Sequence, residues 1–256
     1  MRKQVKPEAF YKKSNLDGIE IIPSETAVVG TAIRFDSQRR EVIVDLGYDW
    51  YGIIPENEVT VYDFTYAESG DVPYQITAII GNQVRAIVVE QVGENTLKLS
   101  RKLSMIRAWH MLEEDSNIRG CITSNIGYGI FFDIGDGLMG YNSRRDCSTV
   151  MISDTNLWYE VGDFIKVKLI DKGDRANSQL ICSHKLAYPE VDEKINPGDV
   201  LAVRIGSKKL EDGYCCQITP RIPGIIDTEI ELYEGQIVKG FVKRITDKGI
   251  KLNHIG

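Results

Sequence analysis

The chain has few of the residues from which enzyme active sites are built. Its 256 residues include only three histidines, His110, His184 and His254, which fall in different segments and suggest no nucleophile–base triad. The carboxylates are numerous but form no spaced pair in an apolar setting that would suit acid–base chemistry. There is neither a Walker loop nor a strand–GxGxxG–helix motif. We therefore expect no enzyme and no cofactor.

Cysteine is also scarce. The chain has five cysteines, an odd number with no CxxC pair, in a sequence long enough to form hydrophobic cores without disulfides. Cys182 and His184 occupy alternate positions of one expected strand, without the further ligands that a zinc site needs. Cys215 and Cys216 are expected in mid-strand with side chains on opposite faces. The sequence thus predicts reduced thiols in a cytosolic protein and no metal site.

Long apolar runs are absent as well. No segment approaches the ~20 consecutive apolar residues that span a bilayer. The basic start, residues 1–6, is followed by neither an apolar stretch nor a small-residue cleavage site, so it does not match a signal peptide. We expect a cytoplasmic protein with no membrane partner.

Finally, the chain has no excess of positive charge. Its 31 Lys and Arg residues face 37 Asp and Glu residues, a net charge of -6, which argues against a general nucleic-acid binder. The distribution is uneven: residues 27–103 carry 7 basic and 11 acidic groups, residues 117–188 carry 8 of each, and residues 196–256 carry 9 and 8. The last two-thirds of the chain could therefore still present a basic face.

What the sequence does contain is a three-unit repeat. Each unit opens with an apolar segment, later reaches a glycine followed by alternating apolar residues, and closes on a short strand. The opening segments are 28–33, 118–123 and 198–203, the glycine segments are 81–89, 162–170 and 235–242, and the closing strands are 97–100, 180–183 and 250–253. The closing residues Ser100, Ser183 and Asn253 lie 83 and 70 residues apart, which indicates loops of variable length.

Within each unit the apolar residues recur with a period of two, which is typical of strands with one buried face. In the second unit Ile130, Phe132 and Ile134 share one face and should fill the core, so that Phe131 points outward. Glycines interrupt these strands where a bulge or turn would bend a sheet. Five short strands in each unit fit a closed barrel of the OB type.

We therefore predict an all-β fold of three tandem OB-type five-stranded barrels with short helical connectors. The predicted divisions are an N-terminal extension (1–26), an acidic first barrel (27–103), a helical connector (104–116), a second barrel (117–188), a linker (189–195) and a degenerate third barrel (196–256). The connector helix is expected over residues 103–114, with Leu103, Ile106 and Trp109 on its apolar face. A shorter helix is expected over residues 4–14, and the linker is expected to be extended.

The second unit resembles a known domain. Its residues 120–122, its segment Asn125–Gly135 with Tyr128-Gly129 before Phe131, and its segment Gly162–Lys168 resemble the S1 RNA-binding domain of bacterial ribosomal protein S1. The first unit and the joint at residues 99–114 resemble the opening repeats of that family and the helix that links them. The resemblance covers residues 27–187 closely and residues 196–256 loosely. It implies OB barrels, single-stranded RNA as the ligand, and opening repeats that can dock on the small ribosomal subunit.

The second unit carries the expected RNA contacts, because single strands are held by aromatic faces for bases and cations for phosphates. The resemblance places Tyr128 and Phe131 at the family's base-stacking positions. Further expected contacts are Ser143, Arg144, Arg145, Lys166 and Lys168. The alternative is that the two aromatic side chains pack against a neighbouring barrel or against the 103–114 helix.

The other two units give weaker signals. In the first unit Ile43 and Arg40 stand at the positions of Phe131 and Tyr128, and its excess of acidic residues should repel phosphate. Secondary RNA contacts are possible at Arg40, Trp50 and Tyr51, although core packing suits the last two better. In the third unit Lys239, Lys243 and Arg244 could add cationic contacts or could simply form a solvated face.

The sequence favours a single-stranded RNA-binding protein of the ribosomal protein S1 type, associated with mRNA or the small ribosomal subunit. The alternative is an OB-fold adaptor that binds a protein partner of the translation, transcription or RNA-decay machinery without direct RNA affinity. A regulator of translation or transcription would differ from the first in its partner rather than in its physics.

Overall fold

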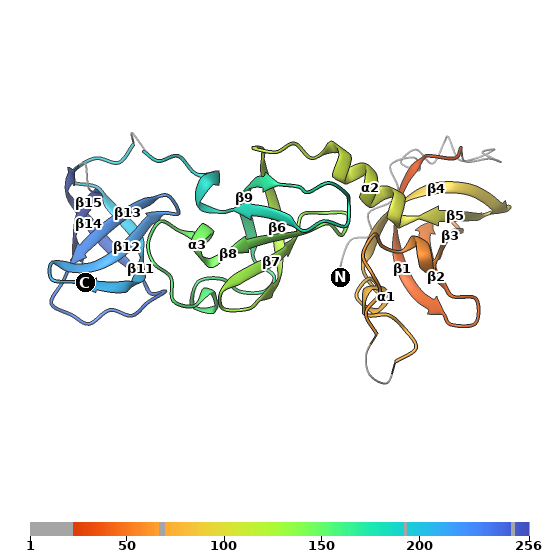
Figure 1. The fold of residues 1–256 in the computed structure, drawn as a ribbon, viewed down its shortest axis with the longest axis horizontal. Coiled ribbons are helices and arrows are strands. Elements are labelled where there is room, and N and C mark those ends of the chain that lie inside the picture. Colours follow the sequence, from red (N-terminus) through yellow and green to blue (C-terminus); the bar gives the residue numbers. More distant parts are fainter. Residues whose placement is uncertain (1–22, 67–69, 192–193, 247–248, 256) are drawn as a thin grey trace. The chain divides into compact units, whose positions relative to one another are not determined.

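A computed structural model describes residues 23–66, 70–191, 194–246 and 249–255. It confirms an all-β protein made of three closed five-stranded barrels with short helices (Figure 1). The helix expected over residues 4–14 lies outside the described residues. The chain divides into two compact units: one holds the first barrel with the helix that follows it, and the other holds the strands of the second and third barrels.

The first barrel contains five strands: β1 (Ala27–Asp36), β2 (Glu41–Gly47), β3 (Trp50–Pro55), β4 (Gln83–Gly93) and β5 (Thr96–Ser100). The short helices η3 (Glu56–Glu58) and α1 (Tyr74–Thr77) fall between β3 and β4. Around the barrel the order is β1-β2-β3-β5-β4, in which β3 and β5 run parallel and the remaining pairs are antiparallel. Val42, Val44 and Leu46 fill its core, as the alternation predicts.

The second barrel repeats this topology with β6 (Asn117–Asn125), β7 (Gly129–Asp133), β8 (Met139–Ser143), β9 (Phe164–Asp171) and β10 (Leu180–Ser183). Between β8 and β9 lie α3 (Arg144–Cys147) and η4 (Thr155–Leu157), and η5 (Lys185–Ala187) follows β10. Ile130 and Phe132 are fully buried, as expected. Ile134 was expected in the core but is only half-buried, because β7 ends at Asp133.

The third barrel consists of β11 (Val200–Leu210), β12 (Gly213–Thr219), β13 (Ile222–Asp227), β14 (Ile237–Thr246) and β15 (Gly249–Ile255). It closes in the same order, with β13 and β15 parallel. Its core contains Val203, Ile205, Cys216 and Val242. Although its sequence matches the repeat loosely, the third unit thus forms a complete barrel. Cys216 is buried and Cys215 is half-exposed, as mid-strand alternation predicts.

One inward position of the third strand is a glycine in every barrel: Gly52, Gly140 and Gly224. A Cβ atom at Gly140 would overlap the ring of Phe132, which pairs with it across β7 and β8. At Gly52 the nearest atoms belong to Leu99, and at Gly224 to Leu252. The space beside each glycine is therefore filled by a large side chain, but not from the same strand in every barrel.

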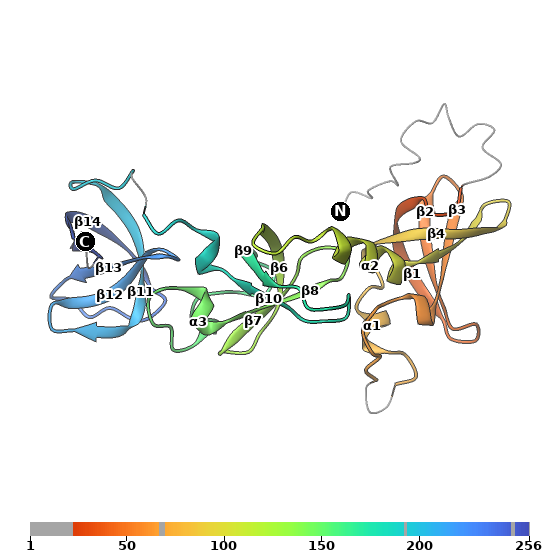
Figure 2. The same cartoon turned by 45° about the horizontal axis from the view of Figure 1, so that its top comes forward.

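The connector helix α2 spans Arg101–Met111, two residues earlier than expected at its start and three at its end. Ser100 caps it, since its Oγ accepts a hydrogen bond of 2.9 Å from the backbone N–H of Leu103. The helix lies beside β4 in both views of the fold (Figures 1 and 2). Its buried face carries Met105 and Trp109. Leu103, expected on that face, is exposed, because a separation of two positions from Met105 turns it by about 200° around the helix axis.

Among the residues that the structure describes, no helix combines the length and the apolar character needed to cross a bilayer.

Candidate functional site

An aromatic pair lies on the outer face of the second barrel. Phe131 on β7 and Tyr141 on β8 are directly opposite each other in the antiparallel ladder. Their ring centroids are 5.0 Å apart and their planes are tilted by 43°. This geometry is that of a favourable aromatic contact, which fixes both rings without burying either one completely. Phe131 points outward, as its alternation with Ile130 and Phe132 predicts.

Tyr128 adds a third ring at the turn before β7. Its side chain is 64% exposed. Gly129 follows it, and the ring of Tyr141 lies over the position where a Cβ of Gly129 would be. Burial raises the pKa of Tyr141, and the nearby Tyr128 hydroxyl raises it further. Tyr128, Phe131 and Tyr141 together form what we call the aromatic cluster.

Sequence reasoning missed Tyr141. Its strand, β8, is short, and its inward residues are Gly140 and Asn142, so the apolar alternation that identifies other strands is absent. The sequence still contained an indication of its position. Tyr141 alternates with Gly140 and Asn142, so it lies on the same face of its strand as Met139 and Ser143, and this strand directly follows the one that carries the outward Phe131.

The predicted phosphate contacts adjoin the aromatic cluster. Ser143 ends β8 opposite Gly129, and the backbone N–H of Arg144 donates a 2.9 Å hydrogen bond to the carbonyl oxygen of Tyr128. The Ser143 hydroxyl donates to Asp146 Oδ2 at 2.6 Å. The guanidinium of Arg144 donates to the carbonyl oxygen of Ser153, and the side chain of Arg145 is exposed. The turn that bears Tyr128 is therefore tied directly to the two arginines.

Buried polar groups on the inner side of the barrel form hydrogen bonds that hold the end of β8 and α3 in place. Asn142 donates through Nδ2 to the carbonyl oxygen of Ser143 (3.0 Å) and to Cys147 Sγ (3.0 Å), and its Oδ1 accepts from the backbone N–H of His184 (2.6 Å). Burial raises the pKa of Cys147 to about 12, which keeps the thiol protonated. His184 donates through Nδ1 to the carbonyl oxygen of Lys166 at 2.6 Å, and burial lowers its pKa. These partners leave the short α3 little freedom to shift.

Lys166 and Lys168 lie elsewhere on the second barrel. Both point outward from β9, which pairs with β6 and β10 but not with β7 or β8. Lys168 forms an ion pair with Asp115 at 3.0 Å, and the ammonium of Lys166 lies 5.2 Å from the ring centroid of Tyr188. The structure therefore brings Ser143, Arg144 and Arg145 to the aromatic cluster but places these two lysines on another strand face.

The first barrel has no aromatic pair at the equivalent place. The register puts Ile43 opposite Ile53 there. Arg40 forms a hydrogen-bonded ion pair with Glu56 and donates to the carbonyl oxygen of Asp71. Trp50 is buried in the core, in line with the core-packing expectation, whereas Tyr51 is 47% exposed and does not belong to the core.

In the third barrel the equivalent pair is Cys215 and Ile225. Both line a groove of about 720 Å³ together with Thr149–Met151 of the second barrel. The backbone N–H of Ser207 donates to the carbonyl oxygen of Met151 at 3.0 Å beside them. The predicted cations of this barrel, Lys239, Lys243 and Arg244, are exposed on β14, which pairs with β11 and β15 only.

The loop between β8 and β9 joins the second barrel to the third. Trp158 is buried there, and its Nε1 donates to Glu234 at 3.2 Å. Arg204 donates to the carbonyl oxygen of Trp158 and lies 5.5 Å from the centroid of its ring. Glu234 also accepts a hydrogen bond of 2.6 Å from the backbone N–H of Ser153. This junction could not be predicted, because its partners are about 50 to 80 residues apart in sequence.

Nothing among the described residues suggests a metal site, since no group of three or more His, Cys, Asp or Glu residues could hold an ion there. The chemistry that the second barrel offers is instead non-covalent. It presents one exposed and two half-buried outward aromatic rings next to cationic side chains, which is the combination that holds single-stranded nucleic acids.

Comparison with known proteins shows which proteins the chain is similar to, although no protein-family model matches it. The chain is 28% identical over 160 residues to small ribosomal subunit protein bS1 of Mycolicibacterium smegmatis, a match that covers 60% of this chain and 31% of the relative. The bS1 protein of Mycobacterium leprae is 27% identical over the same shares. The match thus spans about a third of the length of these relatives.

Among solved structures, a multidomain protein with nucleic acid binding domains from Streptococcus pneumoniae aligns with 90% of this chain and 73% of its own, at 16% identity and a TM-score of 0.34. The similarity to bS1 and the three barrels described above bear out the resemblance of the chain to the S1 RNA-binding domain family.

Proposed function

We propose that the chain binds single-stranded RNA on the outer face of its second barrel. The observation that carries this proposal is the aromatic cluster, because Tyr128 is 64% exposed beside the half-buried outward rings of Phe131 and Tyr141, and together they offer a surface on which bases can stack. Stacking on such rings contributes roughly 1–3 kcal/mol per base and tolerates any base sequence. Ser143, Arg144 and Arg145 directly beside the cluster supply donors for the phosphates.

The expected affinity is micromolar rather than nanomolar. The chain carries a net charge of -6, so its long-range field opposes a polyanion, and the stacking face offers few cations. Binding must therefore come mainly from stacking and from short-range phosphate contacts. A duplex should bind poorly, because its bases are paired and cannot lie on the rings.

In the cell, we propose an association with mRNA or the small ribosomal subunit. The support is the homology to bS1, whose name places it in that subunit. The first barrel suits a docking role on protein, because its outer pair is aliphatic and its residues carry an excess of acidic groups.

The test is a titration of labelled oligo-U and of a matched hairpin into the full chain, followed by fluorescence anisotropy at two salt concentrations. Saturable binding of the single strand, weaker binding of the hairpin, and a loss of affinity with salt are expected. Replacing Tyr128 and Phe131 by Ala should weaken binding about tenfold or more, since two stacking surfaces are lost.

The matched control is Phe164→Ala, which removes an aromatic ring that is 80% exposed on β9, away from β7 and β8. It should leave the affinity unchanged. If oligo-U does not bind even at low salt, the barrels serve protein contacts instead, and a partner of the RNA machinery becomes the object of the search.

A further inference from the structure

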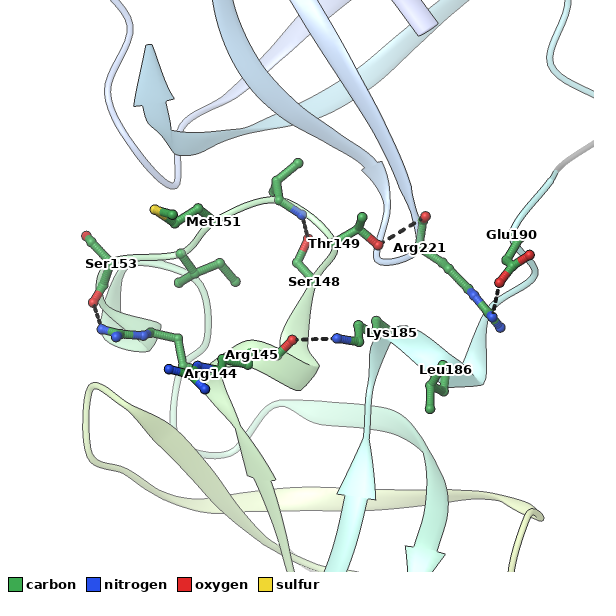
Figure 3. A pocket seen from close by; sticks show the side chains of 12 residues that line it. Arg144, Arg145, Ser148, Thr149, Met151, Ser153, Lys185, Leu186, Glu190 and Arg221 are labelled. Carbon is green, nitrogen blue, oxygen red and sulfur yellow. Dashed lines mark hydrogen bonds and ion pairs between the residues drawn. The ribbon is translucent and has the colours of Figure 1, made fainter. Parts of the chain in front are cut away.

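A concavity lined by several cationic side chains lies next to the aromatic cluster. It is a groove of about 850 Å³ within the unit that holds the second and third barrels. Its walls come from α3, the segment 148–153, η5 with Glu190, and Arg221 just before β13 (Figure 3). We refer to it as the basic groove.

The charge of the basic groove contrasts with that of the chain. Four of its lining residues are cationic and one is acidic: Arg144, Arg145, Lys185, Arg221 and Glu190. The remaining lining residues include the apolar Val150, Met151, Ile152 and Leu186. Cations at a wall with apolar side chains between them suit a chain of alternating phosphates and flat bases.

Two of these cations can bind a phosphate without first breaking a strong ion pair. The side chain of Arg145 is exposed and lines the groove (Figure 3). Lys185 donates to the backbone carbonyl oxygen of Arg145 at 2.8 Å and lies 3.7 Å from Asp146 Oδ1, so its ammonium is held at the wall with its charge only loosely compensated. Such a partly exposed ion pair is weak, so the ammonium of Lys185 can still bind a phosphate.

Arg221 instead already forms an ion pair with a carboxylate of the same chain, which would compete with a phosphate for it. It pairs with the carboxylate of Glu190, whose side chain is 73% exposed, and it also donates to the carbonyl oxygen of Tyr188. A phosphate that enters the groove would face the Glu190 carboxylate and would have to displace it from Arg221. Glu190 therefore lowers the affinity of the basic groove for anions.

The basic groove adjoins the aromatic cluster at Arg144. Arg144 and Arg145 line the groove, and the backbone N–H of Arg144 is bonded to the carbonyl oxygen of Tyr128 at 2.9 Å. A strand whose base stacks on Tyr128 thus has its next phosphates at the mouth of the groove.

We propose that the basic groove binds the phosphate backbone of single-stranded RNA beyond the bases stacked on the aromatic cluster, and that Glu190 restrains this binding by occupying Arg221. This proposal rests on the proposed function, and it adds a second contact region, formed jointly by residues of the second and third barrels, to that site.

Length dependence separates the two proposals. Oligo-U of about 5 and about 15 nucleotides spans the range that single OB barrels cover, so the shorter probe occupies the aromatic cluster and the longer one also reaches the groove. Lys185→Gln, which changes a groove cation outside the stacking site, should reduce the dependence of log affinity on log salt by about 0.7 for the longer probe, the value for one phosphate contact on a single strand. The same variant should leave the slope for the shorter probe nearly unchanged.

Glu190→Gln gives the opposite result. Because it frees Arg221 while removing a negative charge, it should strengthen binding of the longer probe severalfold and steepen its salt dependence. Lys98→Gln on β5 of the first barrel is the control for a change of one charge outside the groove, and thermal unfolding of each variant checks that the fold is retained.

If the shorter probe fails to bind the unmodified chain, the proposed function is wrong. If both probes bind but Lys185→Gln and Glu190→Gln change them equally or not at all, stacking on the cluster stands and the basic groove has no part in binding RNA.

Discussion

The first and second barrels share a topology but differ in what they present to solvent. At the same cross-strand position the first carries Ile43 and Ile53, and the second carries Phe131 and Tyr141. The inward-facing residues follow the same pattern in both barrels. Val44 and Phe132, which come directly after Ile43 and Phe131, each pair with a glycine on the third strand. The fold is therefore determined by one parity of each strand, and the outer surface by the other, so that function can change while the barrel stays the same.

The third barrel shows a further use of the same face. Cys215 and Ile225 stand at the equivalent position, and the segment Thr149–Met151 of the second barrel lies beside them in a shared groove. In this barrel the face takes part in an intramolecular contact, which agrees with its small and aliphatic side chains. Three copies of one fold thus present an aliphatic, an aromatic and a partly covered face.

The largest expected effect is a difference in stability between substitutions on the inward and the outward face of β7. Phe132→Ala should reduce the free energy of unfolding by about 3–5 kcal/mol, because a fully buried ring leaves a cavity. Phe131→Ala, one residue away, should cost only about 1 kcal/mol, the value of its contact with Tyr141. Urea unfolding of the full chain, with hydrogen exchange to localise the change to β7–β10, measures both. Equal costs would mean that the outer face also determines the fold.

An intermediate effect compares the three faces directly. Alanine at Tyr141, Ile53 or Ile225 removes the same position from each barrel in turn. Tyr141→Ala should weaken oligo-U binding by about tenfold, within the roughly 1–3 kcal/mol that one stacked base contributes. The two isoleucine variants should bind as the unmodified chain does. Anisotropy titrations decide the matter, and an equal loss in all three would contradict a site confined to the second barrel.

The smallest expected effect concerns pH. Burial lowers the pKa of His184 below its ordinary value of 6.5, so the unfolded chain binds the proton more readily than the folded one. The contribution to stability is complete above about 6.5 and is lost as the pH falls from there through the folded pKa. The first barrel, residues 27–103, contains no histidine and should lack this dependence.

Hydrogen exchange of the two barrels, corrected for intrinsic rates at about pH 7.5 and about pH 5.5, tests this difference. In His184→Phe the second barrel should lose its pH dependence and should be less stable at the higher pH, because the bond to Lys166 is gone. A dependence that persists in this variant would assign it to another group.

Much of the fold could be predicted from the sequence, because strands with one buried face leave a period of two. The opening, glycine and closing segments all became strands, and Phe131 points outward as expected. Tyr141 could not be found in this way, since the inward partners on its strand are a glycine and a buried asparagine that binds polar groups. The basic groove was also out of reach, because Arg145 and Arg221 come to line one groove through contacts between residues far apart in sequence, such as those of Thr149 and Trp158 with the third barrel.

The inward glycines have a consequence for how such repeats diverge. Each leaves one empty volume, which Phe132 on the second strand fills in one barrel, while Leu99 and Leu252 on the fifth strand fill it in the others. A duplicated barrel can therefore pass from one filling to the other only by changing two positions together. Packing thus couples the interior positions of each copy to one another, whereas its outer residues can change one at a time.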